Sequence, residues 1–95
     1  MKRKLAKPSV QIDDARLKVT RWDFLSGTET GWHKHNMDYV IVPLSNGTLT
    51  AELSGGKTME TELTIGGSYA RAAGVDHNII NNNNSPFSFI EIELK

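Results

Sequence analysis

Histidine is the residue type in this chain with the clearest capacity for chemistry, and the chain contains three of them. His33 and His35 lie two positions apart and lead into the apolar run 39–44. Because successive side chains of a β-strand point to opposite faces, this spacing places both imidazoles on one face. Neutral imidazole is a ligand for zinc, copper, iron and nickel, so the pair supplies half of a metal site. His77 would complete a three-nitrogen set if the fold brings residues 77–81 beside the first pair.

The elements that must position these histidines are β-strands, because the dominant spacing of apolar residues is two rather than 3.6. Apolar and polar residues alternate over residues 48–54 and again over 58–65. In the last segment, apolar residues at 90, 92 and 94 alternate with Glu91 and Glu93. Such alternation is typical of a strand with one buried and one solvent-facing side, and it predicts that these two glutamates face solvent.

Turn residues separate the alternating runs. Asn46-Gly47 is a strong signal for a type I′ hairpin turn, since both residues tolerate a positive φ. Gly55-Gly56, Gly66-Gly67 and the polar run 82–86 mark further turns. Turns therefore recur about every 8–12 residues, as in all-β sandwiches and barrels. No segment carries a helical stripe, so the predicted fold class is all-β with antiparallel strands.

The run 39–44 departs from simple alternation, because it is apolar on both faces. Val40, Val42 and Leu44 share one face, and Tyr39 and Ile41 share the other. A strand of this kind is covered twice, by its own core and by a second surface. We therefore predict a homodimer that uses this strand. Proline cannot donate to a β-ladder, so residue 43 is expected at a strand end or edge.

Composition limits the classes of protein and partner. The 95 residues suffice for one domain, predicted over residues 9–95 after a flexible basic tail at residues 1–8. Eleven basic and eleven acidic residues give no net charge, which argues against a nucleic-acid partner. The absence of cysteine excludes disulfides and thiolate zinc sites and is compatible with the cytoplasm. No apolar run approaches the roughly 20 residues that span a bilayer, so no membrane association is predicted.

The glycine and histidine spacings resemble those of the cupin superfamily. Its first motif, G-x5-H-x-H-x(3,4)-E-x6-G, maps onto Gly27, His33, His35 and Gly47. Its second motif, G-x5-P-x-G-x2-H-x3-N, maps onto the following residues, with alanine in place of proline: Gly66, Ala72, Gly74, His77 and Asn81. The resemblance implies a single jelly-roll barrel of the small conserved-barrel kind. It also implies that His33, His35 and His77 bind one divalent metal ion.

The glutamate of the first motif has no counterpart in this chain. Its slot falls on Tyr39 or Val40, and neither is a carboxylate. Tyr39 shares a face with both histidines, so its phenol is expected to point into the pocket. Asp38 is the nearest acid, and it would point inward only if a β-bulge followed His35. We expect three histidines without a carboxylate; Asp38 as a fourth ligand, and a chain that holds no metal, remain alternatives.

A three-histidine site leaves the full charge on the ion, which favours an anionic small-molecule ligand or a metal-generated hydroxide. Arg71 could bind a substrate carboxylate, or it could form a surface ion pair. Tyr39 and Tyr69 are further candidates for substrate contacts, and Asn81 either lines the pocket or holds a turn. The ligand set does not choose among iron, zinc, nickel, manganese and copper.

The expected function is that of a small metal-binding cupin. Resemblance to three-histidine cupin dioxygenases suggests oxygenation of a small substrate, while isomerase and lyase activities also occur on this fold. One alternative is a metal-dependent module that binds or senses a small molecule without catalysis. The other is a structural dimer without metal. The fold does not decide among them, because it hosts many unrelated activities.

Overall fold

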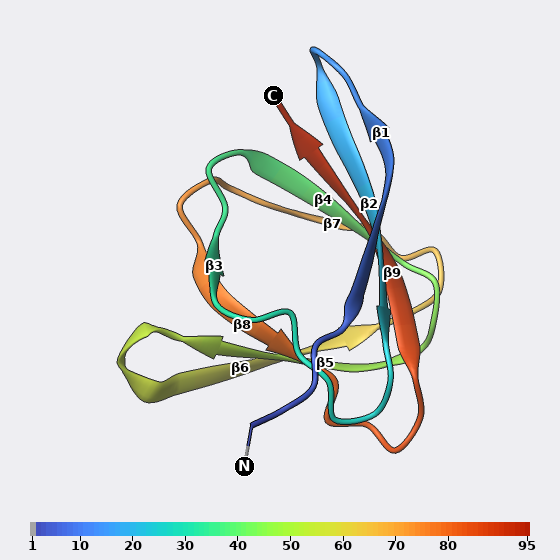
Figure 1. The fold of residues 1–95 in the computed structure, drawn as a ribbon, viewed down its shortest axis with the longest axis vertical. Helices are drawn as coiled ribbons and strands as arrows, with labels where there is room; N and C mark the ends of the chain where they lie inside the picture. Colours follow the sequence, from blue (N-terminus) through green and yellow to red (C-terminus); the bar gives the residue numbers. More distant parts are fainter. Residues whose placement is uncertain (1) are drawn as a thin grey trace.

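Two antiparallel sheets make up the structure, a computed structural model that describes residues 2–95. One sheet has the strand order β1-β2-β9-β4-β7, with β1 Lys7–Asp13, β2 Leu17–Phe24, β9 Phe87–Leu94, β4 Asp38–Pro43 and β7 Tyr69–Arg71. The other has the order β3-β8-β5-β6, with β3 His33–Lys34, β8 Asp76–Ile80, β5 Gly47–Leu53 and β6 Lys57–Leu63. Strands β3 and β8 lie on the opposite side of the interior from β2 and β9 (Figure 1). The predicted all-β class is confirmed.

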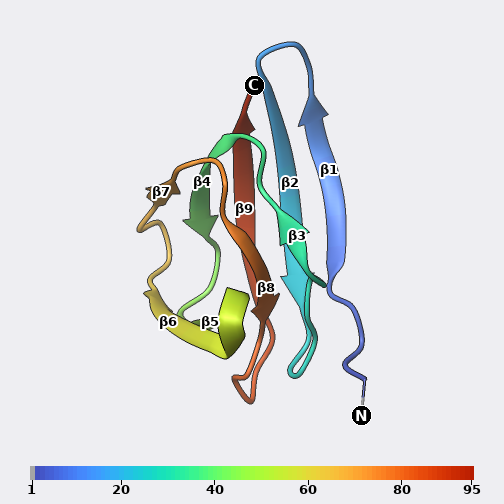
Figure 2. The same ribbon diagram turned by 90° about the vertical axis from the view of Figure 1, so that its left-hand side faces the viewer.

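The core lies between the two sheets and is centred on aromatic rings. Phe24 of β2 contacts Phe87 and Phe89 of β9, with ring centroids 4.9 and 5.5 Å apart. Figure 2 shows that these long strands run side by side behind β3 and β8. Within residues 2–95, no helix is long or apolar enough to cross a membrane. The core comes from strand residues and Ala6, and the helical structure described is one short 3₁₀ turn at Ser54–Gly56.

In strand β9, the face that was predicted to be exposed to solvent is the one that points into the core. Phe87, Phe89 and Glu91 are buried, whereas Ile90 and Ile92 lie half-buried on the outer face of the sheet. Burial of two phenylalanines removes more apolar surface from water than burial of two isoleucines, so the aromatic face is turned inward. Because side chains alternate, Glu91 is carried inward with them. The prediction that it faces solvent is wrong.

The predicted hairpin at Asn46-Gly47 is also wrong. Strand β4 pairs with β7 and β9, whereas β5 pairs with β6 and β8, so this turn crosses between the sheets. Asn46 does not adopt a positive φ, and its side-chain oxygen accepts a hydrogen bond from Ile65 N at 3.0 Å. The tight hairpin lies instead at Gly55-Gly56, where φ angles of 80° and 77° suit glycine. Pro43 ends β4, as expected.

Asn81 holds the turn that follows β8. Its side chain is fully buried, and its amide donates to the carbonyl oxygens of Phe24 and Ser85 at 3.3 and 2.9 Å. Its own oxygen accepts from the backbone and side-chain nitrogens of Asn83. Of the two roles considered for Asn81, the structure shows the turn role.

The N-terminal segment contacts the barrel before β1 begins. Leu5 forms a β-bridge with Glu29, and Ala6 N donates to Glu29 O at 2.7 Å. The Arg3 guanidinium also reaches the Glu29 carboxylate, at 3.2 Å. Residues 3–8 were expected to form a flexible tail. In the structure this segment is bound to Glu29 through backbone and side-chain contacts, and β1 already begins at Lys7. Met1, also assigned to the tail, lies outside the described residues.

Candidate metal centre

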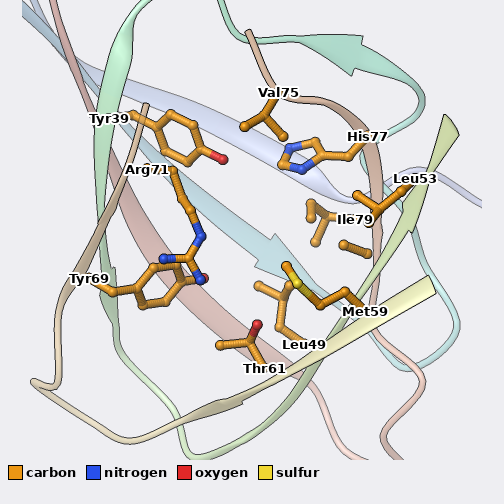
Figure 3. Close-up of a pocket in the computed structure, with 11 residues that line it drawn as sticks. Tyr39, Leu49, Leu53, Met59, Thr61, Tyr69, Arg71, Val75, His77 and Ile79 are labelled. Carbon is orange, nitrogen blue, oxygen red and sulfur yellow. The ribbon is translucent and has the colours of Figure 1, made fainter. Parts of the chain in front are cut away.

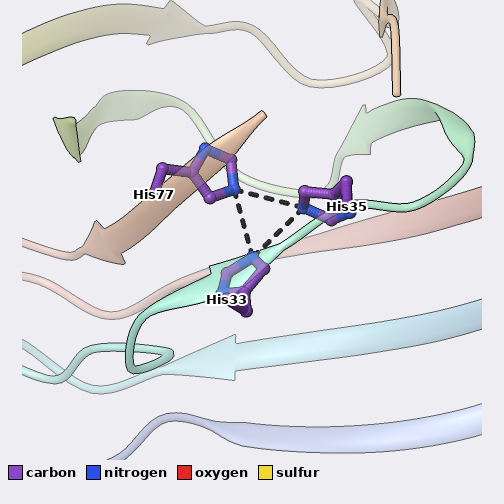
Figure 4. A group of neighbouring side chains, drawn as sticks. All are labelled: His33, His35 and His77. Atoms are coloured by element: carbon purple, nitrogen blue, oxygen red, sulfur yellow. Dashed lines mark hydrogen bonds between the residues drawn. The ribbon is translucent and has the colours of Figure 1, made fainter. Parts of the chain in front are cut away.

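Three imidazoles converge at one end of the short β3–β8 ladder. His33 of β3 is the register partner of His77 of β8, which places the two side chains on the same face. His35 follows β3, and its backbone is held by hydrogen bonds with Val75 O and Gly74 N. The three Nε2 atoms lie 3.1 Å from one another, as the dashed lines in Figure 4 show. The predicted convergence of residues far apart in the chain is confirmed.

The spacing of the nitrogens suits a shared cation. Three nitrogens that each lie about 2.1 Å from one ion are separated by about 3.0–3.4 Å in tetrahedral or octahedral geometry. His33 Nδ1 lies 2.9 Å from Gly31 O and donates its proton there, which leaves the Nε2 lone pair directed at the centre. Facing lone pairs repel one another, and a cation among them would relieve that repulsion. These residues therefore fit a divalent metal ion.

Burial keeps two of the imidazoles in the neutral form that binds metal. His35 is 3% exposed to solvent and His77 is 7% exposed. Burial, together with the neighbouring histidines, lowers the pKa of His35 to about 4 and that of His77 to about 3. Both are therefore unprotonated at neutral pH, and a metal ion would not have to compete with bound protons.

These pKa values predict acid sensitivity of the metal-free protein. In the unfolded chain, His35 and His77 have the ordinary histidine pKa of 6.5. Below pH 6.5 the unfolded chain therefore binds protons at these residues that the folded chain does not bind. The free energy of unfolding is therefore expected to fall as the pH falls from 6.5 towards 4. Glu91 acts in the opposite sense, because burial raises its pKa to about 7 and its protonation stabilises the fold as the pH falls.

Urea unfolding of metal-free protein between about pH 7.5 and 4.5 measures this effect. The loss of stability from two histidines exceeds the gain from one glutamate, so the free energy of unfolding is expected to decrease as the pH falls. Glu91→Gln removes the opposing gain and is expected to make the decrease steeper. Stability that is constant or rising from about pH 6.5 to 4.5 would contradict the prediction.

Tyr39 occupies the place where the first cupin motif has its glutamate. Its ring stacks on His35 with centroids 3.9 Å apart and an interplanar angle of 22°. Burial raises the pKa of its phenol to about 12, so the group is neutral and supports the histidine by packing. Asp38 lies on the outer face of an unbroken β4 ladder, where its carboxylate accepts a hydrogen bond from Ala73 N at 2.8 Å. No bulge turns Asp38 inward, which removes the alternative that it is a fourth ligand.

A cavity of about 200 Å³ opens beside His77 (Figure 3). Its walls are mainly apolar and come from both sheets, with Leu49, Leu53, Met59, Val75 and Ile79 among them. The polar groups are those of Tyr39, Tyr69, Arg71, Thr61 and His77. An apolar cavity with a few convergent polar groups is the usual form of a small-molecule site.

Three of the four residues expected to contact substrate line this cavity: Tyr39, Tyr69 and Arg71. The Arg71 guanidinium lies 4.5 Å above the Tyr69 ring and donates one hydrogen bond to Ala70 O. It takes part in no ion pair with a described carboxylate, so it could accept a ligand carboxylate. The structure does not bring Asn81 to this cavity.

The sequence reasoning missed two glutamates beside the histidines. Glu91 Oε2 lies 3.8 Å from His35 Nε2, and Glu93 Oε2 lies 4.0 Å from His35 Nδ1. Both carboxylates belong to the inner face of β9. The signal that could have found them is the alternation Phe87, Phe89, Glu91, which places the first glutamate on the aromatic face.

The two facing sheets and the histidine cluster define a double-stranded β-helix protein with a candidate metal centre. A cupin-domain crystal structure from Bordetella pertussis Tohama I superposes with a TM-score of 0.95, at 53% identity over 100% of this chain and 98% of that one. An RmlC-like cupin from Methanocaldococcus jannaschii superposes at 0.75 with 16% identity, covering 99% of this chain and 85% of that one, and supports the fold alone. This chain belongs to the cupin superfamily.

The comparison of sequences points to a particular relative. The chain is 47% identical over 90 residues to the beta-alanine degradation protein BauB of Pseudomonas aeruginosa, covering 95% of this chain and 94% of that protein. No family model matches the chain. The family assignment therefore rests on the cupin domain from Bordetella pertussis, which is 53% identical over 100% of this chain.

Proposed function

We propose that this cupin binds one divalent metal ion through His33, His35 and His77 and uses it on a small carboxylate. The observation that carries the proposal is the triangle of Nε2 atoms, each 3.1 Å from the other two. Hydrogen bonding of His33 and burial of His35 and His77 supply the neutral, oriented ligands that such a site requires.

The cavity beside His77 supports a small ligand with one anionic end. Its walls are apolar, and Arg71 provides a cation whose planar guanidinium matches a carboxylate. The name of the Pseudomonas relative concerns degradation of β-alanine, which is itself a small carboxylate. We extend this substrate class, small aliphatic carboxylates of about that size, to the present chain.

The proposed reaction is oxygenation, the chemistry suggested by resemblance to three-histidine cupin dioxygenases. A bound iron(II) ion would supply the capacity to bind and activate O₂. The residues of this chain hold three of its positions, orient the substrate through Arg71 and surround the reacting end with apolar side chains. Tyr39, with its neutral phenol at the cavity wall, offers a hydrogen-bond donor beside His77.

The test uses tag-free protein loaded with iron(II) and a panel of small carboxylates that includes β-alanine and propionate. Oxygen consumption is expected with at least one of them, and Arg71→Gln is expected to raise KM by about 10- to 100-fold. Arg21→Gln is the matched control, because Arg21 pairs with Asp23 on the surface. Ligand-dependent thermal shifts without oxygen consumption would instead identify a binding module. Loaded protein that shows neither would overturn the proposal.

We also propose that the protein is a homodimer, with the outer face of the five-stranded sheet as its interface. Val40 and Val42 of β4 pair with Ile92 and Ile90 of β9 on that face, and all four are half-buried. Ile12 and Leu94 extend the apolar surface and are 48% and 47% exposed. A self-complementary apolar face favours a two-fold dimer of identical chains.

Substitution in this face is expected to dissociate the dimer. Val42→Asp would place an unpaired carboxylate in an apolar interface, which we expect to weaken dimerisation by more than about 100-fold. Sedimentation or light scattering measures the mass. Ile65→Asp serves as the control, since this side chain is 61% exposed in the turn that follows β6, a strand of the other sheet. A wild-type protein that is monomeric at micromolar concentration would contradict the proposal.

A further inference from the structure

We propose that Glu91 of β9 supplies the carboxylate that the first motif of this chain lacks, as a fourth ligand to the ion held by the three histidines. The inference rests on the proposed metal binding and adds a ligand from a strand outside both motifs. It makes the centre a three-histidine, one-carboxylate site.

The sheet register places Glu93 directly opposite the vacant slot at Tyr39 and Glu91 diagonal to it. On the inner face of the β4–β9 pair, Ile41 is opposite Glu91 and Tyr39 is opposite Glu93. Directly opposed side chains on one face have Cβ atoms about 4.5–5.5 Å apart, and diagonal neighbours are within reach of long side chains. The carboxylate absent from position 39 is therefore available one strand away, from the strand that pairs with β4.

The burial of Glu91 calls for a positive partner. The residue is 8% exposed, and it makes no ion pair with a lysine or arginine among residues 2–95. Its carboxylate instead lies beside the imidazole of His35, with Oε2 3.8 Å from Nε2. A buried carboxylate without a cation is costly, and a divalent ion at the histidine centre would offset that cost.

One buried polar group without a hydrogen-bond partner, the indole N–H of Trp22, lies on the same face as Glu91. The Nε1–H group of Trp22 has no hydrogen-bond acceptor in the structure, and it is the only such side-chain atom among the buried ones described. Trp22 pairs with Phe89, and the adjoining inner-face pair is Thr20 with Glu91. A modest rotation of the glutamate could let one oxygen accept from Trp22 while the other binds the ion.

The distances place Glu91 beside the clustered nitrogen of His35 and Glu93 beside the other nitrogen of the same ring. Glu91 Oε2 is 3.8 Å from His35 Nε2, whereas neighbouring ligand atoms on an octahedral ion are about 3.0 Å apart. A shift of less than about 1 Å, within the range of side-chain rotation, would bring these two atoms to that separation. In the metal-free structure Glu91 groups with His35 and Glu93, so ligation also requires its side chain to turn towards His33 and His77. Glu93 approaches the opposite ring nitrogen, His35 Nδ1, at 4.0 Å, where a carboxylate fixes the tautomer of a metal-bound histidine.

The experiment compares Glu91→Gln with Glu93→Gln in the full chain, using cobalt(II) as the probe. Chelator competition measures affinity, and the visible spectrum with X-ray absorption reports the ligands at the ion. Glu91→Gln is expected to weaken cobalt binding on the order of 100-fold and to change the spectrum, because an oxygen ligand is lost. Glu93→Gln is expected to weaken binding about tenfold with an unchanged ligand count, because it acts through His35. Glu91→Asp, which keeps a shorter carboxylate, should lie between wild type and Glu91→Gln.

The outcomes separate this inference from the function on which it rests. If wild type binds cobalt and His77→Ala does not, but Glu91→Gln binds within twofold of wild type with the same spectrum, the inference alone is overturned. If wild type binds no cobalt, the proposed metal function and this inference both fail. Circular dichroism of metal-free Glu91→Gln checks its folding, and removing a buried charge is not expected to destabilise it.

Discussion

Replacing His77 with alanine is expected to reduce the metal content of the protein from about one ion per chain to nearly none. His77 supplies one of three nitrogens in the cluster, and its Nε2 lies 3.1 Å from each of the other two. Loss of an outer partner of a metal ligand already weakens binding by about 10–100-fold, so loss of a ligand should exceed 100-fold. Elemental analysis of tag-free protein after dialysis measures the content.

The matched control for His77→Ala is Lys34→Ala. Lys34 lies between His33 and His35 in the chain, and its side chain is exposed, so this variant should retain about one ion. His33→Ala should behave like His77→Ala, because each of the two paired strands, β3 and β8, contributes one of the proposed ligands. Full metal content in His77→Ala would contradict a shared centre.

Replacing Phe24 with alanine is expected to lower the free energy of unfolding by about 3–5 kcal/mol. Phe24 is 1% exposed and contacts the rings of both Phe87 and Phe89, so alanine would leave a cavity between β2 and β9. Small domains are stable by only about 5–15 kcal/mol, so the loss is a large part of the total. Urea or guanidinium unfolding of metal-free wild type and variant at one protein concentration measures the difference.

Leu25→Ala is the control for the core substitution. Leu25 is the next residue in the chain, yet it is 71% exposed, so its truncation should change stability by less than about 0.5 kcal/mol. A loss below about 1 kcal/mol in Phe24→Ala would show that the aromatic cluster is not the centre of the core.

Local spacing in the sequence was sufficient to predict the all-β class and the common face of His33 and His35. A period of two identifies strands wherever it occurs, and the His33-x-His35 spacing assigns both rings to one face without knowledge of the neighbours. The same rule placed the Tyr39 side chain on the inner side, where the structure has it. The expectation for His77 came from resemblance to the second cupin motif, and the structure places this residue opposite His33.

Only the tertiary structure decided which strands pair and which face of a strand is buried. Local turn residues favoured a hairpin at Asn46-Gly47, but β4 pairs with β7 and β9 in one sheet, whereas β5 pairs with β6 and β8 in the other. In β9, both faces contain apolar residues, so alternation alone does not determine which face is inside. The packing of Phe87 and Phe89 against Phe24 selects one face, and this choice carries Glu91 to the histidines. Burial energy depends on neighbours from the whole fold, which spacing along the chain does not specify.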